Sequence, residues 1–203
     1  YTYLRRRAKK YNKRCGKNTG RGVIPHRVDI SERPAVVEEK RRVGDFELDT
    51  IIGKGRTGAL VSIVDRATKY LFLRFVSSKT ADAVTSALVN ALHPLAAQKL
   101  VHTLTSDNGK EFATHQTISA RLGASFYFAR PYHSWQRGLN EHTNGLIRQY
   151  FPKGTDFSTL THERVRYVEQ ILNNRPRKVL SFYTPREIFS QLTSVPLCGN
   201  SQT

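Results

Sequence analysis

Residues 46–76 read FELDTIIGKGRTGALVSIVDRATKYLFLRFV, and this stretch decides the fold class. Residues 46–53 form one apolar segment that ends in glycine, and residues 58–76 contain two more. All three are rich in β-branched and aromatic residues, which is the composition of β-strands. The polar run Asp65–Lys69 divides the second segment from the third and is typical of a turn. We therefore predict three consecutive strands, the last two joined by this turn.

Beyond residue 76 helical periodicity alternates with short apolar segments. Strands are predicted at 101–109 and 124–132, and helices at 80–95, 115–123, 140–150, 161–174 and 184–192. Thr80 suits the start of the first helix, Pro94 its end, and Gly123 the end of the second. This order predicts an α/β protein with a mixed sheet flanked by helices.

The charge of the chain points to a polyanionic partner. Its 203 residues include 33 Lys and Arg against 16 Asp and Glu, which gives a net charge of +17. Nucleic acid is the first choice of partner and an anionic membrane surface the second. Because no stretch approaches 18 uninterrupted apolar residues, we predict no membrane-spanning segment.

The basic charge is concentrated at the start of the sequence. Residues 1–42 hold 14 Lys and Arg but only 4 acids, and they show no sustained apolar period. We predict a basic extended arm at 1–42 that contacts DNA, a catalytic core at 43–192 and a tail at 193–203. A solvated tail is the alternative interpretation of the arm. The residues of the arm expected to bind DNA are Arg5, Arg6, Arg7, Lys9 and Lys10.

Cysteine and methionine usage bears on the cellular context. Cys15 and Cys198 are the only cysteines, and their separation argues against a disulfide framework or a structural zinc site. We therefore predict a cytoplasmic location. Methionine is absent even at position 1, which indicates a piece of a longer chain.

Three acids occupy positions where ordinary structure gives little reason for a charge. Asp49 lies inside an apolar strand, Asp107 ends another and precedes Asn108-Gly109, and Glu141 lies near the start of a helix. Charged groups in a sheet are costly unless something compensates them, and divalent metal is a common solution. Two Mg²⁺ ions about 4 Å apart can activate an attacking oxygen and neutralise a leaving oxygen in phosphoryl transfer. We therefore predict that Asp49, Asp107 and Glu141 bind metal.

Each acid also has an ordinary interpretation. Asp49 could face solvent from an edge strand, Asp107 could simply form the turn, and Glu141 could lie on an exposed helix surface. Other acids compete for the first role. Glu47 has the same side-chain parity as Asp49, Asp45 resembles a strand boundary, and Asp65 a turn residue. Spacing alone does not choose among them.

Several motifs in a fixed order carry a family resemblance from about residue 30 to residue 189. They are GDFELDTIIGK, GALVSIVDRATKYLFL, SDNGKEFATH, YFARPYHSWQRGLNEHTNGLIRQYFPKGTDF and LNNRPRKVLSFYTPREIF. The sequence resembles the integrase-type core of the IS30-family bacterial transposases. That resemblance implies an RNase H-like fold and a DDE triad of Asp49, Asp107 and Glu141, with 33 residues between the last two. It also implies an upstream helix-turn-helix region, which we do not find in this sequence.

Further DNA contacts are expected around the triad. Asn144 and Arg148 share a helix face with Glu141, and Trp135 could stack on a base. The alternatives are a solvated helix face and a tryptophan that closes the core. The remaining candidates follow Asp107 or lie in the basic turn at 173–178, and they are Asn108, Lys110, Arg175, Arg177 and Lys178.

Three functions are compatible with these features. The first is a bacterial transposase, acting near the nucleoid with two Mg²⁺ ions, or Mn²⁺ in their place. It would cleave transposon ends and join them to target DNA. Its DNA partners would be the terminal inverted repeats and the target, and pairing of two ends implies at least a dimer. The second is a metal-dependent nuclease of the same fold without joining activity. The third, a DNA-binding protein without catalysis, is disfavoured because all three acids are present, and the resemblance favours the first.

Overall fold

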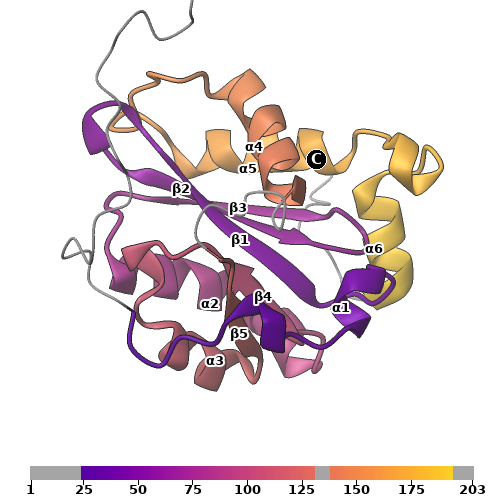
Figure 1. The fold of residues 1–203 in the computed structure, drawn as a ribbon. Helices are drawn as coiled ribbons and strands as arrows, with labels where there is room; N and C mark the ends of the chain where they lie inside the picture. The colour runs from indigo at the N-terminus through magenta and orange to yellow at the C-terminus, as the bar shows by residue number, and fades with distance from the viewer. Residues whose placement is uncertain (1–23, 131–137, 194–203) are drawn as a thin grey trace, which may run out of the picture.

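A five-stranded mixed sheet forms the centre of the protein (Figure 1). The structure is a computed structural model that describes residues 24–130 and 138–193. The strands run in the order β3-β2-β1-β4-β5. Their bounds are β1 (Asp45–Ile52), β2 (Ala59–Asp65), β3 (Leu71–Val76), β4 (Thr103–Ser106) and β5 (Ser125–Phe128). β1, β2 and β3 pair antiparallel, whereas β4 pairs parallel with both β1 and β5. The predicted mixed sheet and α/β class are confirmed.

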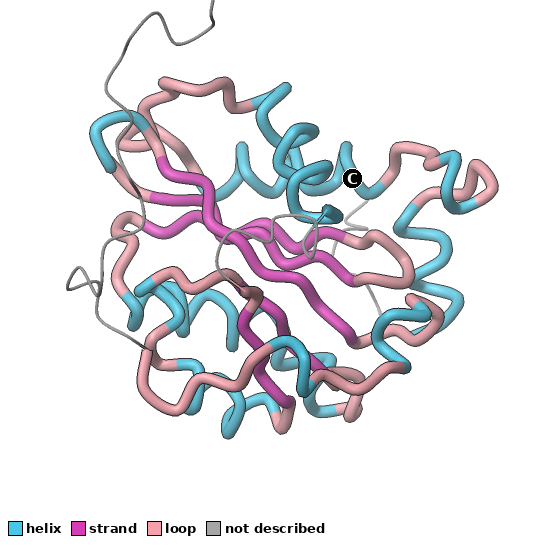
Figure 2. Tube along the Cα trace, viewed as in Figure 1, coloured by secondary structure: helices cyan, strands magenta, loops and turns pink. Residues whose placement is uncertain are grey.

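Helices cover both faces of this sheet, as Figures 1 and 2 show. The α-helices of the described residues are α1 (Val36–Glu39), α2 (Ala81–Ala97), α3 (His115–Leu122), α4 (Gly138–Tyr150), α5 (His162–Asn173) and α6 (Pro185–Thr193). α2 and α3 lie on one face, and α4 and α5 on the other. In the described part of the chain, no helix combines the length and the apolar character needed to cross a membrane.

Two apolar cores, one on each face, follow from the alternation of side chains along the strands. Phe46 and Leu48 of β1 are fully buried in the core under α2 and α3. Ile51 belongs to the second core, under α4 and α5. Since neighbouring residues of a strand point to opposite faces, Asp45, Glu47 and Asp49 share the α4 face with Ile51. One strand therefore carries three acids toward one helical layer.

The predicted turn and helix ends are confirmed in most cases. Asp65 accepts hydrogen bonds from the backbone N–H and the hydroxyl of Thr68, each at 2.8 Å, which closes the turn between β2 and β3. Thr80 caps the N-terminus of α2 by accepting a bond from the Ala83 N–H. Gly123 ends α3 with a φ of +63°, a conformation that glycine adopts without steric cost.

The prediction that Pro94 ends its helix is wrong, because α2 continues to Ala97. Proline removes the hydrogen bond that its own N–H would make to the carbonyl four residues earlier. That residue is Asn90, which is exposed, so water can hydrate its carbonyl. The buried Leu92 and Leu95 hold the last turns against the core. Packing thus offsets the missing hydrogen bond.

Residues 24–42, which were expected to belong to the arm, pack in part against the core. Ile24, Ile30 and Val37 are buried, and Asp29 forms a single parallel bridge with Phe128 at the end of β5. The Arg33 side chain is also buried and donates a 2.9 Å hydrogen bond to the Thr105 hydroxyl of β4. The most basic part of the predicted arm, residues 1–23, lies outside the described residues, as does the predicted tail after Thr193.

The outer edge of β3 is covered by polar side chains of α5. The Asn173 amide accepts from the Leu71 N–H and donates to the Leu71 carbonyl, both at 2.8 Å. Four residues earlier on the helix, the Glu169 carboxylate accepts from the Leu73 N–H at 2.5 Å and from Arg74 at 2.6 Å. An uncovered edge strand is open to pairing with other chains. The side chains of α5 therefore satisfy backbone groups of β3 and cover this edge of the sheet.

We predict that Asn173→Ala destabilises the protein by about 1–3 kcal/mol, because it leaves the N–H and carbonyl of Leu71 buried without partners. Urea unfolding measures the loss, and hydrogen exchange should become faster at the Leu71 amide. Asn174→Ala is the matched control, because Asn174 is exposed on the adjacent position. A surface change of this kind should cost less than about 0.5 kcal/mol. Equal losses in the two variants would contradict this account of the edge.

Burial raises the pKa of Glu169 above its ordinary value of 4.5, although Arg74 and the Leu73 N–H act in the opposite direction. The folded protein then binds more protons than the unfolded chain between the two pKa values, so rising pH costs stability in that window. A glutamine in place of Glu169 cannot ionise, but its side-chain oxygen can still accept from the Leu73 N–H. We therefore predict that Glu169→Gln gains stability relative to wild type as pH rises from 4 to about 7.

Unfolding free energies of both proteins at several pH values test this expectation. Glu187→Gln provides a control of opposite sign. Hydrogen bonds from the Thr184 backbone and hydroxyl hold the pKa of Glu187 below its ordinary value. The stability that Glu187 contributes is present above the unfolded pKa and is lost as pH falls. The unfolding free energy of Glu187→Gln should therefore fall relative to wild type as pH rises. A pH-independent difference for Glu169→Gln would show that its burial has no electrostatic cost.

Candidate active site

The parallel pairing of β1 with β4 brings Asp49 and Asp107 together. Glu47 of β1 pairs with Thr105 of β4, and continuing this register by two residues sets Asp107 beside Asp49. Asp107 follows the last residue of β4, and its carboxylate accepts a 3.0 Å hydrogen bond from the Gly109 N–H. Both aspartates are partly exposed. In parallel strands, side chains in register point to the same face, here the face of α4.

The acids that competed with Asp49 in the sequence are neutralised in the structure. Asp45 is 2% exposed and accepts two bonds from Arg42, at 2.8 and 3.0 Å, and one from Thr103 at 2.7 Å. Glu47 is also 2% exposed and forms a 2.9 Å ion pair with Arg66. Their surroundings are those of structural charges, since buried charges persist when they are paired and hydrogen-bonded. Asp49 is the more exposed of the three acids on this strand face.

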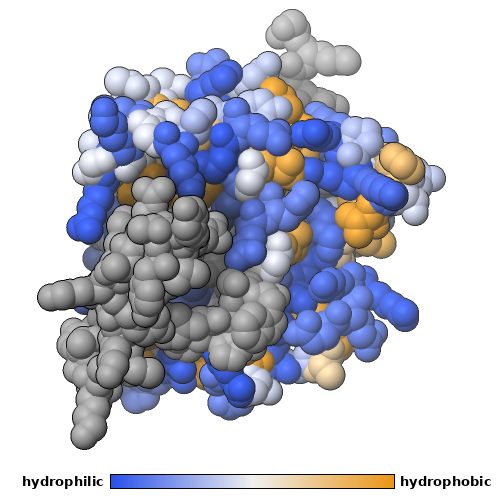
Figure 3. All heavy atoms as spheres, turned by 45° about the horizontal axis from the view of Figure 1, so that its top comes forward, coloured by the Kyte–Doolittle hydropathy of each residue, from blue (hydrophilic) through white to orange (hydrophobic). Residues whose placement is uncertain are grey.

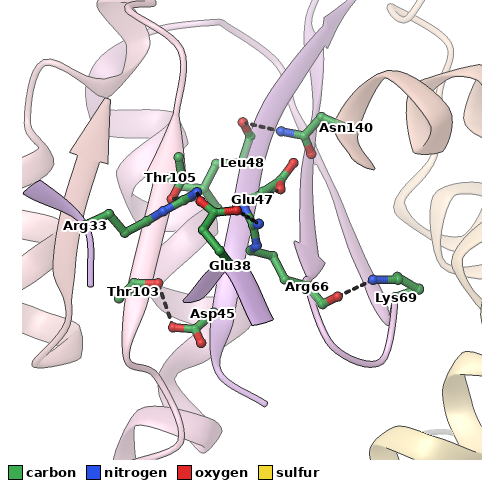
Figure 4. Close-up of polar contacts among 10 residues, drawn as sticks. All are labelled: Arg33, Glu38, Asp45, Glu47, Leu48, Arg66, Lys69, Thr103, Thr105 and Asn140. Atoms are coloured by element: carbon green, nitrogen blue, oxygen red, sulfur yellow. Dashed lines mark hydrogen bonds and ion pairs between the residues drawn. The ribbon is translucent and has the colours of Figure 1, made fainter. Parts of the chain in front are cut away.

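α4 crosses β1 directly over Asp49. Near its start, the Asn140 amide donates a 3.1 Å bond to the Leu48 carbonyl, drawn in Figure 4. One turn later, the Asn144 amide donates a 2.7 Å bond to the Asp49 carboxylate, which also accepts from the Thr50 N–H at 2.8 Å. Glu141 lies on the first turn of this helix, one turn before Asn144, and is exposed. The structure therefore brings Asp49 and Asp107 together, and it places Glu141 on the helix that crosses over Asp49.

The donor atoms at this end suit a hard divalent cation, which prefers oxygen ligands. The carboxamide oxygen of Asn144 is buried and has no hydrogen-bond partner within the described residues, and the same holds for that of Asn140. Residues 24–130 and 138–193 nevertheless contain no three acidic, histidine or cysteine side chains close enough to hold a metal ion as they stand. The adjacent aspartates and the Asn144 oxygen fit a metal, while Glu141 stands apart on the helix surface.

The turn after Asp107 contains a residue that reasoning from the sequence missed. Glu111 is buried and accepts 2.7 Å bonds from the Thr50 hydroxyl and the Lys79 ammonium. Thr50 follows Asp49 on β1. The Glu111 carboxylate therefore links the turn after Asp107 to the strand that carries Asp49. Gly109 leaves room for this carboxylate, since a Cβ there would overlap it. In the sequence, the signal that could have identified Glu111 was its position as an acid next to the apolar Phe112.

Two of the predicted DNA contacts are engaged inside the protein. Asn108 donates a 2.7 Å bond to the Ala129 carbonyl and accepts one from Arg27. Asn144 is bonded to Asp49. These bonds indicate that both amides position the candidate site. The prediction that they contact DNA is untested.

The other predicted contacts are distributed around the described surface. The Arg148 guanidinium donates hydrogen bonds of 3.3–3.4 Å to the carbonyls of Phe151 and Pro152, which follow α4, and of Ile52 at the end of β1. Lys110, Arg175 and Lys178 are exposed, and Arg177 is half-buried. Polar side chains dominate the described part of the face seen in Figure 3. Trp135 and the arginines and lysines at 5–10 lie outside the described residues.

Comparisons with known proteins agree with this fold and site. The model of the integrase core domain family matches residues 39–134, a range that includes Asp49 and Asp107. The transposase for insertion sequence element IS4351 of Bacteroides fragilis is 54% identical over 95% of this chain and 58% of its own length. The transposase for IS1086 of Cupriavidus metallidurans is 39% identical, over 87% of this chain and 52% of its own length.

The transposase InsI for IS30C of Escherichia coli is 38% identical, over 80% of this chain and 42% of its own length. The chain thus spans about half the length of the curated relatives that it matches. Its mixed sheet flanked by helices is the RNase H-like arrangement of an integrase core. By fold and by these matches, the chain belongs to the integrase-core family of the IS30-type transposases.

Proposed function

We propose that this chain is the catalytic part of a DNA transposase, which cleaves transposon ends and joins them to target DNA. The observation that carries this proposal is the register of β1 and β4, which sets Asp49 beside Asp107 beneath α4. The three relatives described above are named as transposases of insertion sequences, which favours joining over hydrolysis alone. The net charge of +17 suits a DNA partner.

Asp49, Asp107 and Glu141 are the residues that we propose to hold divalent metal, Mg²⁺ or Mn²⁺. When bound, two such ions would activate the attacking oxygen and neutralise the leaving oxygen of the scissile phosphate. The protein's own part is positioning. Asn144 fixes the Asp49 carboxylate, and Glu111 fixes the turn that follows Asp107. Both aspartates are thereby held in place before DNA arrives, which lowers the cost of organising the site.

Exposed basic side chains would hold the DNA backbone. Lys110, Arg175 and Lys178 are exposed, and lysine and arginine contacts to phosphate carry most sequence-independent affinity. The terminal inverted repeats and the target would be the two DNA substrates. Pairing of two ends implies that at least two copies of the protein act together.

We predict that Asp49→Asn, Asp107→Asn and Glu141→Gln each reduce cleavage and joining by about 10³-fold or more, because loss of a metal ligand removes several kcal/mol of transition-state stabilisation. Affinity for end DNA should change little. Glu163→Gln, an exposed acid on the first turn of α5, removes the same charge away from the site and is the control.

A gel assay with labelled ends and a target plasmid measures both reactions. Wild-type protein with Mg²⁺ should yield nicked ends and joined products. Nicks without any joined product would favour the nuclease of the same fold. Wild-type activity in any of the three variants would remove that residue from the proposed site.

We predict that Asn144→Ala reduces cleavage by about 10–100-fold, the usual cost of losing a residue that orients a metal ligand. Because its amide is bonded to Asp49, the dissociation constant for DNA should stay within about twofold, less than one lost phosphate contact would cost. Gln191→Ala, at an exposed position of α6, is the control. Weaker DNA binding with unchanged turnover would assign Asn144 to a DNA contact.

A further inference from the structure

A cavity of about 500 Å³ lies next to the candidate active site, and residues of β1 and α4 line both. Glu47 lines it, two residues before Asp49 on the same face of β1, a separation of about 7 Å along a strand. Gly138 and Leu139 of α4 line it too, immediately before Asn140 and Glu141. Its volume is within the range of about 300–1,000 Å³ typical of small-ligand sites.

The cavity carries an excess of positive charge. Four basic and two acidic side chains line it, which gives a net charge of +2, and they are Arg33, Lys40, Arg66, Arg130, Glu38 and Glu47. This excess of positive charge suits an anionic ligand.

The floor is a rigid network of paired charges, drawn in Figure 4. Glu38 accepts from Arg33 and, at 2.9 Å, from Arg66, whose other terminal nitrogen donates to Glu47 at 2.9 Å. The Arg33 guanidinium is also bonded to Thr105. Only 3% of each arginine side chain is exposed. Guanidinium and carboxylate groups held in this way can donate to and accept from the edge of a base.

Two features point to a ligand beyond the charge itself. Arg66 lines the cavity, and its Nε–H is buried without a hydrogen-bond partner within the described residues. The first turn of the thirteen-residue helix α4 forms part of the wall. Backbone N–H groups of a first helical turn lack partners within the helix and favour phosphate.

We propose that this cavity binds an unpaired nucleotide of the DNA strand that the adjacent site cleaves. The base enters between the apolar side chains of Ile30 and Leu139, and its edge meets the charged floor. The phosphate lies at the mouth, near Lys40 and the start of α4. Enzymes that do chemistry on a base extrude the nucleotide into a pocket of this kind, which shows that such a pocket can hold a single unpaired nucleotide. This assignment rests on the proposed function only for the source of the nucleotide.

The test uses the whole chain and the four deoxynucleoside monophosphates, with inorganic phosphate and deoxyribose 5-phosphate as probes that lack a base. We expect the nucleotides to bind and to shift the backbone amide signals of Ser31, Gly138 and Leu139 in NMR spectra. The two probes without a base should bind about tenfold more weakly, because they do not engage the floor. Equal affinity for phosphate and nucleotides would overturn the proposal.

Rim variants locate the binding. Lys40→Asn keeps a residue that tolerates the positive φ of 55° at this position while removing the charge. Arg130→Gln removes the second rim charge, and Asp29→Asn is its control, because it breaks the Arg130–Asp29 ion pair of 3.1 Å but keeps the arginine. Each charge-removing variant should weaken nucleotide binding about tenfold. Asp29→Asn and Asp107→Asn should not.

Nucleotide affinity unchanged in both rim variants would overturn the cavity assignment, even if the same preparation cleaves DNA with Mg²⁺. Nucleotide binding that depends on Lys40 and Arg130 supports it, even in a preparation without cleavage activity. In that case the proposed function would fail and the nucleotide site would stand. Affinity that falls in Asp107→Asn as strongly as in the rim variants would place the nucleotide in the metal site and overturn the assignment.

Discussion

The parallel register between β1 and β4 is the constraint on which the candidate site depends. A parallel pair needs a crossover between its strands, and here the crossover contains β2, β3 and α2. Residues 49 and 107, which are far apart in the sequence, are therefore neighbours only through this tertiary pairing. A shift of one residue in this register would turn one aspartate toward the opposite apolar core. The Thr103–Asp45 hydrogen bond, which joins β4 to β1, opposes that shift.

The acids along β1 differ in how their charges are compensated. Asp45 and Glu47 are deeply buried and paired with Arg42 and Arg66, so they resemble the interior charges of a folded domain. Removing one partner from such a pair leaves an isolated buried charge at a cost of about 3–5 kcal/mol. Asp49 instead meets amide donors and partial solvent. A carboxylate that is partly exposed can exchange such hydrogen bonds for a metal ion at a lower cost than a deeply buried one.

Much of the fold could be predicted from the sequence because its signals are local, as at Thr80, which caps α2 through its own side chain. The prediction that Pro94 ends its helix was wrong because the packing of the apolar residues around it outweighed the tendency of proline to end a helix. The acids of the candidate site could be proposed from the sequence, but the contacts of their neighbours could not. Choosing Asp49 over Glu47 relied on the family resemblance, since the two have the same parity and similar flanks. The physical difference is that Arg66, beyond the end of β2, reaches back to Glu47, a contact between distant residues that no local pattern reveals.

Arginine has a geometric advantage in the charged floor beneath this site. The Arg66 guanidinium bridges Glu38 of α1 and Glu47 of β1 through different nitrogens, which links the segment before the sheet to the strand that carries Asp49. A lysine ammonium is a point charge without this planar fork, so it would not fix the direction of both bonds. The network therefore orients two segments as well as neutralising two acids. Glu141, by contrast, is exposed on the first turn of α4. In the proposed site, aspartates held by hydrogen bonds would reduce the cost of organisation, and this surface glutamate would complete the metal site when DNA and metal arrive.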